Sequence, residues 1–398
     1  MIIKNVKIFQ EDHAFHAGVI YLQDGMIEHI QPESELDGAE PIPQEGEQVI
    51  DGRGCYAIPG MIDLHFHGCM GSDVCDATEE ALHTIAKYEA SIGVTAISPA
   101  TMTLSGDELV HVLENAASYK KKMAGAADAA YEAELVGINM EGPFISLAKK
   151  GAQNPKYIHK PDIIPCDVEL FYRFQRAADG LVKFIGIAPE EPGAIPFVDA
   201  VKDEVSVSLA HTNSDYEHAM EAFSHGANHA VHLYNAMPPF THRAPGVVGA
   251  VADNPHVMAE MICDGVHIHP SVVRATFAML GKERMILISD SMRAAGMPDG
   301  RYTLGGLDVD VKGNRATLVS DGALAGSVTT LPDCMRTVVQ KMGLPLETAV
   351  AAATENPARS LGIYDQQGSL TAGKKANVVL LDEDLKLVAV VKDGVQIA

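Results

Sequence analysis

The stretch MIDLHFHG, residues 61–68, ends an apolar run with two histidines placed one residue apart. Because side chains alternate between the two faces of a strand, His65 and His67 are expected to point the same way. Two such imidazoles can hold a metal ion together. The same pattern also fits two solvated histidines at a strand end, so the rest of the chain has to decide between these readings.

Short β-branched runs alternate with Ala/Glu/Lys-rich helical stretches through the middle of the chain. Such alternation predicts βα units and a parallel sheet. Eight candidate strands lie around residues 59–65, 94–98, 135–140, 182–188, 205–210, 228–232, 257–262 and 285–289. Eight parallel strands with helical crossovers predict an α/β fold of the (β/α)8 TIM barrel type. A doubly wound open sheet is the alternative, but no G-x-G-x-x-G motif opens a first helix.

Both ends of the chain carry β-hairpin signals. Residues 18–30 place two apolar runs around Asp24-Gly25, and residues 376–398 have the same texture and reach Asp393-Gly394 near the end. Neither piece is long enough to bury a sheet alone. We therefore predict that residues 1–56 and 360–398 form one small β-sandwich domain, beside a catalytic barrel domain at residues 57–359. Within the barrel domain, the segment near 301–320 predicts a β-hairpin insertion.

The composition of the 398 residues excludes several classes of protein. The net charge of −23 argues against nucleic acid and anionic membranes as partners, because both need basic patches. A small anionic substrate stays possible, since a few local cations can hold one phosphate. No run approaches the ~18 apolar residues of a transmembrane helix, and the start of the chain alternates like a strand rather than a signal peptide. Six scattered cysteines without a C-x-x-C motif predict free thiols in a reducing cytoplasm.

Five of the eight predicted strands end in a potential metal ligand. These ligands are His65 and His67, Glu141, His211, His232 and Asp290. In a barrel, the carboxyl ends of all strands meet on the face where active sites of this fold are built. Imidazole and carboxylate groups without thiolates favour Zn²⁺ or Fe²⁺ over Mg²⁺ or Ca²⁺. The sequence therefore predicts a transition-metal site at the mouth of the barrel.

Four histidines and two carboxylates are too many for one tetrahedral site, but they suffice for two cations. One cation would use the ligands of the first and eighth strands, and the other those of the fifth and sixth. The carboxylate of the third strand, Glu141, would lie between them. Asp290 invites a second role, because a carboxylate beside such a cation can accept a proton from water and donate it to a leaving amine. Alternatively, Asp290 is only a ligand or caps the following helix.

Seven motifs together carry a resemblance: GMIDLHFHG, NMEGPFIS, AHTNSD, HLYNAMPP, CDGVHIH, ISDSMRAAG and ALAGS. The chain resembles the N-acetylglucosamine-6-phosphate deacetylases of the amidohydrolase superfamily over essentially its whole length. HLYNAMPP, and EGPF with KKGAQNP, are more specific to these deacetylases than the H-x-H motif. The resemblance implies metal-dependent hydrolysis of N-acetyl-D-glucosamine 6-phosphate to D-glucosamine 6-phosphate and acetate, in amino-sugar catabolism. It implies one or two divalent transition metals per subunit.

The resemblance also implies roles for individual residues. Metal ligands fall on Glu141, His211 and His232, and the catalytic acid/base falls on Asp290. Substrate contacts fall on Ala152, Gln153, Asn235, Ala236, Arg243, Asp264, Gly265, Val266, His267, Leu324, Ala325 and Gly326.

Several of these substrate contacts have a physical reading. Asn235 and the backbone at Ala236 can hydrogen-bond a phosphate, and Arg243 offers a fork of donors suited to it. Relatives form dimers in which such cations reach across the interface, so a homodimer is implied. His267 would hydrogen-bond a sugar hydroxyl. Gln153 stands where some relatives have histidine, so it keeps an amide donor but cannot carry a charge.

Three other functions stay open from the sequence. The epimeric substrate, N-acetylgalactosamine 6-phosphate, is not excluded. A cyclic-amide hydrolase of the dihydroorotase type is disfavoured, because those enzymes commonly bridge two metals with a carboxylated lysine on strand four. Here Lys183 lies near the start of that strand and not at its end. A non-catalytic binding relative is disfavoured because all six candidate metal ligands are present.

Overall fold

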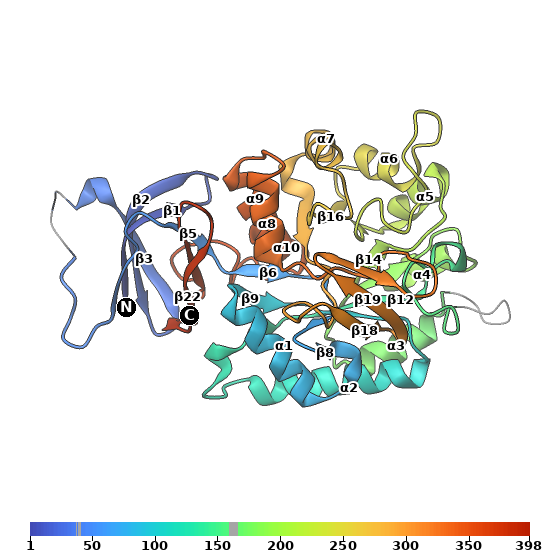
Figure 1. Ribbon diagram of the computed structural model, residues 1–398, viewed down its shortest axis with the longest axis horizontal. Helices are drawn as coiled ribbons and strands as arrows, with labels where there is room; N and C mark the ends of the chain where they lie inside the picture. The colour runs from blue at the N-terminus through green and yellow to red at the C-terminus, as the bar shows by residue number, and fades with distance from the viewer. Residues whose placement is uncertain (37, 39–40, 159–165) are drawn as a thin grey trace.

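A barrel of eight parallel strands, each followed by helical structure, forms the body of the protein (Figure 1). The computed structural model describes residues 1–36, 38, 41–158 and 166–398. The barrel strands are β6 (Met61–Asp63), β9 (Val94–Ile97), β12 (Ile138–Phe144), β13 (Val182–Ile187), β14 (Ser206–Leu209), β15 (His229–Ala230), β16 (Met258–Ile262) and β17 (Met285–Ile288). All eight coincide with the strands expected from the sequence, which confirms the TIM-barrel prediction.

Hydrogen bonds close the barrel between its first and last strands. The parallel strands form two hydrogen-bonded sheets, β11-β9-β6 and β10-β12-β13-β14-β15-β16-β17, where β10 (Ala100–Thr101) and β11 (Glu134–Leu135) are short strands. The backbone N–H of Asp290 donates to the carbonyl of His65 at 3.0 Å, and that of His67 donates to Ser291 at 2.7 Å. These two bonds join the segments that carry the H-x-H motif and Asp290, and so they set the position of one ligand against the other.

Helices cover the outside of the barrel. They are α1 (Glu79–Ser91), α2 (Gly106–Met123), α3 (Val168–Ala177), α4 (Ala194–Val201), α5 (Tyr216–His225), α6 (Gly246–Asp253), α7 (Pro270–Leu280), α8 (Leu331–Gln340), α9 (Leu346–Ala353) and α10 (Glu355–Ser360). Local sequence explains where they begin: Ser105 and Glu108 form a capping box at α2, and the Thr78 side chain accepts from the N–H of Ala81 at α1. In α1 and α2 the buried residues recur every three or four positions, which gives each of these two helices one buried face.

The two ends of the chain meet in one β-sheet beside the barrel, at the left of Figure 1. Its strands are β1 (Ile2–Phe9), β2 (Phe15–Gln23), β3 (Met26–Pro32), β4 (Val49–Asp51), β5 (Tyr56–Pro59), β21 (Val378–Leu381), β22 (Leu387–Lys392) and β23 (Val395–Gln396). Their order is β23-β22-β21-β5-β1-β2-β3, with β4 also on β1. The central junction joins β21 antiparallel to β5, and strands from both ends bury one shared apolar cluster. The small β domain from both ends is as predicted, although β5 extends past residue 56.

A three-stranded antiparallel sheet follows the eighth barrel strand, where the sequence predicts a single hairpin. It consists of β18 (Gly300–Leu304), β19 (Leu307–Lys312) and β20 (Arg315–Leu318). Together with Met102 and Met292, it buries its own apolar cluster. In the described part of the chain, no helix is both long and apolar enough to cross a membrane.

Candidate functional site

The six predicted metal ligands converge at the carboxyl end of the barrel, and all six are buried. His65 and His67 follow β6, Glu141 lies in β12, His211 follows β14, His232 follows β15 and Asp290 follows β17. Three of them turn the chain through the left-handed region, with φ of 43° at His211, 27° at His232 and 48° at Asp290. Non-glycine residues at such φ values store strain and cluster at functional sites. These turns end the strands and direct the three side chains to one point.

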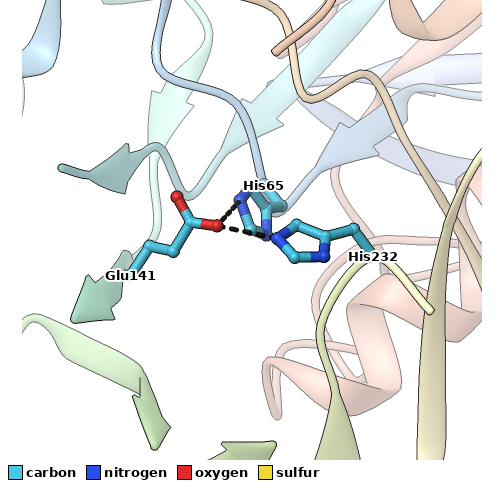
Figure 2. Close-up of side chains that lie close together, drawn as sticks. All are labelled: His65, Glu141 and His232. Carbon is cyan, nitrogen blue, oxygen red and sulfur yellow. Dashed lines mark hydrogen bonds and ion pairs between the residues drawn. The ribbon is translucent and has the colours of Figure 1, made fainter. Parts of the chain in front are cut away.

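Glu141 lies at the centre of the group. Its Oε1 atom is 2.8 Å from the Nε2 atom of His211 and 2.8 Å from the Nε2 atom of His232. The same oxygen is 3.7 Å from the Nε2 atom of His65, as the two dashed lines of Figure 2 show for His65 and His232. One carboxylate oxygen therefore faces three imidazole nitrogens, as expected of a ligand that lies between two cation positions.

The second carboxylate, Asp290, faces the H-x-H motif. Its Oδ1 atom is 3.3 Å from the Nε2 atom of His67 and 3.8 Å from the Nε2 atom of His65. Two sets of ligand atoms each lie within 4.8 Å of one another: His65, Glu141 and His232 form one set, and His65, His67 and Asp290 form the other. The second set is the one the sequence assigned to the first cation. His65 belongs to both.

The other ring nitrogen of three histidines is already engaged outside the site. Nδ1 of His67 lies 3.0 Å from the carbonyl oxygen of Ala100, and Nδ1 of His211 lies 2.9 Å from that of Lys149. Because a carbonyl only accepts, each Nδ1 carries a proton, and Nε2 is the ring nitrogen that faces the site. Nδ1 of His65 lies 2.7 Å from the Oε2 atom of Glu260.

One observation tests directly whether a cation fits. Among the described residues, nothing hydrogen-bonds the Nε2 atom of His65, although it is buried. A buried nitrogen without a partner is destabilising. A divalent cation would satisfy this lone pair and neutralise the two carboxylates beside it, so the donor set fits a metal ion.

Charge on the two carboxylates is stabilised by the surrounding imidazoles. Burial opposes ionisation of Glu141, but His211, His232 and His65 outweigh it and hold the pKa of its carboxyl well below the usual range. Burial likewise opposes ionisation of Asp290, yet His67 and His65 lower its pKa. Both groups therefore carry negative charge at neutral pH, the form in which carboxylates bind metals.

A cavity of about 270 Å³ opens over this cluster. Of the predicted substrate contacts, Ala152, Gln153, Asn235, Ala236, His267, Leu324 and Gly326 line it. Ala325 is buried and does not line it. Arg243 is exposed and lines a separate pocket of about 420 Å³, so within one chain the structure does not bring it to the cavity. The other lining residues were not anticipated from the sequence: Met102, Gly151, Leu304 and Ala323.

Asp264, Gly265 and Val266 are not on the cavity wall, but the first of them holds His267. One oxygen of Asp264 accepts from the backbone N–H groups of Val266 at 2.8 Å and His267 at 2.9 Å. The other lies 2.7 Å from Nδ1 of His267. Burial disfavours charge on His267, but Asp264 outweighs burial and raises the pKa of the imidazole. The Nε2 edge of His267 is left to face the cavity.

Gln153 uses both ends of its amide inside the protein. Its Nε2 donates to the Oε2 atom of Glu141 at 2.6 Å, and its Oε1 accepts from the backbone N–H of Thr103 at 2.7 Å. The side chain is buried. In this arrangement Gln153 orients the central carboxylate, a contact that the sequence did not predict.

The most important residue missed from the sequence is Glu260, at the centre of the apolar strand MAEMI. It is fully buried and contacts His65 and His229. Burial disfavours its charge, but these two histidines lower the pKa of its carboxyl to about 2. A carboxylate inside a strand of otherwise apolar residues was the available signal, because such a group is rarely fully buried without a charged partner.

Comparison with known proteins places this site in a family. The profile of the amidohydrolase family matches residues 56–397. The chain belongs to the amidohydrolase family. Amidohydrolases are metal-dependent hydrolases, and the His/Glu/Asp cluster of this member is a group that could bind the metal.

Individual amidohydrolases resemble this chain over almost its full length. The N-acetylglucosamine-6-phosphate deacetylase of Bacillus subtilis (strain 168) is 36% identical over 395 residues, which cover 99% of this chain and 96% of the relative. The N-acetylgalactosamine-6-phosphate deacetylase of Escherichia coli O157:H7 is 32% identical, covering 94% and 96%. A mutant N-acetyl-D-glucosamine-6-phosphate deacetylase from Mycobacterium smegmatis, solved in complex with N-acetyl-D-glucosamine-6-phosphate, superposes with a TM-score of 0.87. It is 30% identical, and the match covers 100% of this chain and 99% of that structure.

Proposed function

We propose that this amidohydrolase removes the acetyl group of N-acetyl-D-glucosamine 6-phosphate, giving D-glucosamine 6-phosphate and acetate in amino-sugar catabolism. The observation that carries the proposal is the convergence of four imidazole Nε2 atoms and two carboxylates in one cluster, of which all but His65 line one cavity. The full-length similarity to N-acetylglucosamine-6-phosphate deacetylases supports the choice of substrate.

The residues divide into two candidate cation positions that share Glu141. His211 and His232 would hold one cation with it, and His65, His67 and Asp290 would hold the second. Zn²⁺ or Fe²⁺ suits this set of nitrogen and oxygen ligands. When bound, such a cation polarises a carbonyl and lowers the pKa of water from ~15.7 towards ~7.

Asp290 is the proposed acid/base. Its carboxylate accepts a proton from the water that attacks the acetamido carbonyl, and it returns that proton to the nitrogen as the C–N bond breaks. The proton is therefore conserved within the cycle: it leaves the water and ends on the amine. Support comes from the position of Asp290 at the cavity wall and from its ionised state in the presence of two neighbouring imidazoles.

The remaining wall of the cavity offers neutral and cationic groups to the sugar phosphate. His267, held by Asp264, would hydrogen-bond a sugar hydroxyl, and Asn235 with the backbone at Ala236 would hydrogen-bond the phosphate. Arg243 of the partner subunit would complete the phosphate site, because the same residue in one chain lies in a different pocket. This assignment requires a homodimer. The six free cysteines support a location in the reducing cytoplasm.

A second candidate substrate is N-acetylgalactosamine 6-phosphate, since a deacetylase of that name is 32% identical to this chain. A dihydroorotase-type reaction is disfavoured, because the ammonium of Lys183 donates to the carbonyl of Gly180 and that lysine lies at the start of β13. In this chain Glu141, rather than a lysine, would offer a carboxylate to both candidate cation positions.

Acetate release from a panel of N-acetyl-hexosamines, with and without a 6-phosphate and in a series of divalent metals, tests the proposal. We expect turnover of the phosphorylated gluco compound with Zn²⁺ or Fe²⁺, and little turnover of unphosphorylated sugars. Preference for the galacto epimer would replace the substrate assignment. Protein that neither contains a transition metal nor responds to added Zn²⁺ or Fe²⁺ would favour a non-catalytic binding role.

A further inference from the structure

A buried hydrogen-bond network extends beneath the proposed metal site, on the side away from the cavity. At its centre, the Oε2 atom of Glu260 lies 2.7 Å from Nδ1 of His65, and the Oε1 atom lies 2.9 Å from Nε2 of His229. Nδ1 of His229 lies 3.3 Å from the hydroxyl oxygen of Ser360, in α10. His65, His229 and Glu260 are completely buried. Nothing in the proposed reaction uses Glu260, yet it occupies the interior of the barrel at a high desolvation cost.

The contact with Glu260 determines how His65 can serve the site. An ionised carboxylate only accepts hydrogen bonds, so Nδ1 of His65 donates to Glu260 and Nε2 is the nitrogen left to bind a cation. That nitrogen faces the cavity cluster without a hydrogen-bond partner among the described residues. A carboxylate on the far nitrogen also makes an imidazole a stronger metal ligand. Asn139 donates to the carbonyl of Leu64 at 3.1 Å and to the Oε1 atom of Glu260 at 3.4 Å, which fixes the carboxylate in turn.

The two candidate cation positions differ in their dependence on this network. His65 belongs to both sets of ligand atoms, and it is the residue that joins His67 and Asp290 in the second set. Around Glu141, the rings of His211 and His232 lie at 2.8 Å and His65 at 3.7 Å, so this position keeps three close ligands without His65. In the part of the chain that the structure describes, no hydrogen bond or ion pair joins either of these two rings to the carboxylate of Glu260, whose ring partners are His65 and His229. The backbone N–H of His232 donates to the Oε2 atom of Glu260 at 3.2 Å, but this bond does not orient the ring.

We propose that Glu260 is the positioning residue that makes His65 a metal ligand, so that the cation at His65, His67 and Asp290 depends on Glu260 and the cation at Glu141, His211 and His232 does not. This inference rests on the proposed two-cation site. It predicts that loss of Glu260 converts a two-metal protein into a one-metal protein, and does not simply unfold it.

Zn²⁺ binding to the full-length protein tests the proposal. Protein stripped with a chelator is titrated with Zn²⁺ in the presence of a competing chelator, and zinc per chain is measured by elemental analysis. Glu260→Met removes both acceptor oxygens at similar volume, and we expect roughly 10–100-fold weaker binding of the second Zn²⁺ with the first unchanged. Glu260→Gln keeps one acceptor oxygen, so we expect an intermediate loss. If Glu260→Met does not fold, the Zn²⁺ titration is carried out on Glu260→Gln.

Glu89→Gln is the matched control. Glu89 is also a buried carboxyl, and burial, together with the charge of Asp63, raises its pKa well above the usual range, so an amide replaces a neutral acid. Its side-chain hydrogen bond is with Cys69, and among the described residues no hydrogen bond or ion pair joins it to a candidate metal ligand. We expect this variant to bind two Zn²⁺ ions with the affinities of the parent.

The outcomes separate this inference from the proposed function. Selective loss of one Zn²⁺ in the Glu260 variants supports the inference. Two Zn²⁺ ions bound with unchanged affinity, or equal weakening of both sites, overturns it while leaving the proposed function intact. A parent that binds a single Zn²⁺ also overturns it, and a parent that binds none overturns both.

Discussion

Replacing Asp290 with asparagine removes the proposed acid/base and changes little else. Asp290 has a φ of 48°, and asparagine is among the few residues that share the tolerance of aspartate for the left-handed region. Its backbone N–H, which donates to the carbonyl of His65, is unaffected by the substitution. Alanine would add backbone strain to the chemical change, so Asp290→Asn is the sharper variant.

The expected loss of activity follows from the two proton transfers assigned to this carboxylate. General acid–base catalysis contributes about 10²–10⁴-fold to a rate, and each tenfold is about 1.4 kcal/mol of activation free energy. An amide oxygen at this place, 3.3 Å from His67 Nε2, still offers a lone pair to the site, but it cannot take up a proton. We therefore expect kcat for acetate release to fall by about 10³–10⁴-fold, because both the attack and the departure of the amine use the same group.

The assay is the initial rate of acetate release at saturating substrate, with metal content and melting temperature measured on the same preparation. Folding should persist because an amide matches a carboxylate in size and shape, while the favourable interactions of the Asp290 charge with His67 and His65 are lost together with the repulsion from Glu141. Asp310→Asn serves as the control variant, because Asp310 is an exposed carboxylate that pairs with Arg301 on the three-stranded sheet of β18, β19 and β20. Turnover by Asp290→Asn within about threefold of the parent, at equal metal content, would show that another group moves the proton.

Three further outcomes are expected. Treatment with a chelator should abolish acetate release, and added Zn²⁺ or Fe²⁺ should restore it; activity that survives complete removal of metal would contradict the proposed chemistry. Gly60→Ala should lower the melting temperature by several degrees. The Cβ of the new alanine would lie 2.8 Å from the Cβ of buried Thr95, and such overpacking costs about 1–3 kcal/mol. An unchanged melting temperature would show that the strand can shift to make room. The pKa of Asp264 is lowered from 3.8, and the pKa of His267 is raised from 6.5. This ion pair therefore contributes fully to stability between pH 3.8 and pH 6.5. The contribution is lost as the pH rises through the raised pKa of His267. Asp264→Asn should therefore lower the melting temperature more at about pH 6 than at about pH 10, and an equal loss at both would refute the ion pair.

The strands and the ligands at their ends were predictable because each is a local pattern. Apolar β-branched runs mark the barrel strands, and a ligand residue directly after such a run must lie at the carboxyl face. Convergence of Glu141, His211 and Asp290 therefore needed only the barrel topology. The same reasoning placed both chain ends in one small β domain, since neither end could bury its apolar face alone.

The supporting contacts were not predictable, because they depend on distances between segments that are far apart in the chain. Glu260 meets His65 across 195 residues and His229 across 31. From the sequence, a single glutamate in an apolar strand gives no indication of which partner it has. Gln153 likewise looked like a substrate contact until the structure placed its amide between Glu141 and Thr103. The role of Arg243 depends on a second copy of the chain, which one sequence cannot position.

The junction of β5 with β21 has a consequence for the synthesis of the protein. β5 borders the barrel's first strand, but its antiparallel partner begins at Val378, more than three hundred residues later. During translation the growing chain therefore leaves the ribosome with one edge of this early sheet unpaired, while the whole barrel is still being made. An unpaired strand edge invites pairing with other chains. We expect the nascent protein to need protection by chaperones for longer than a protein whose small domain is encoded in one continuous segment.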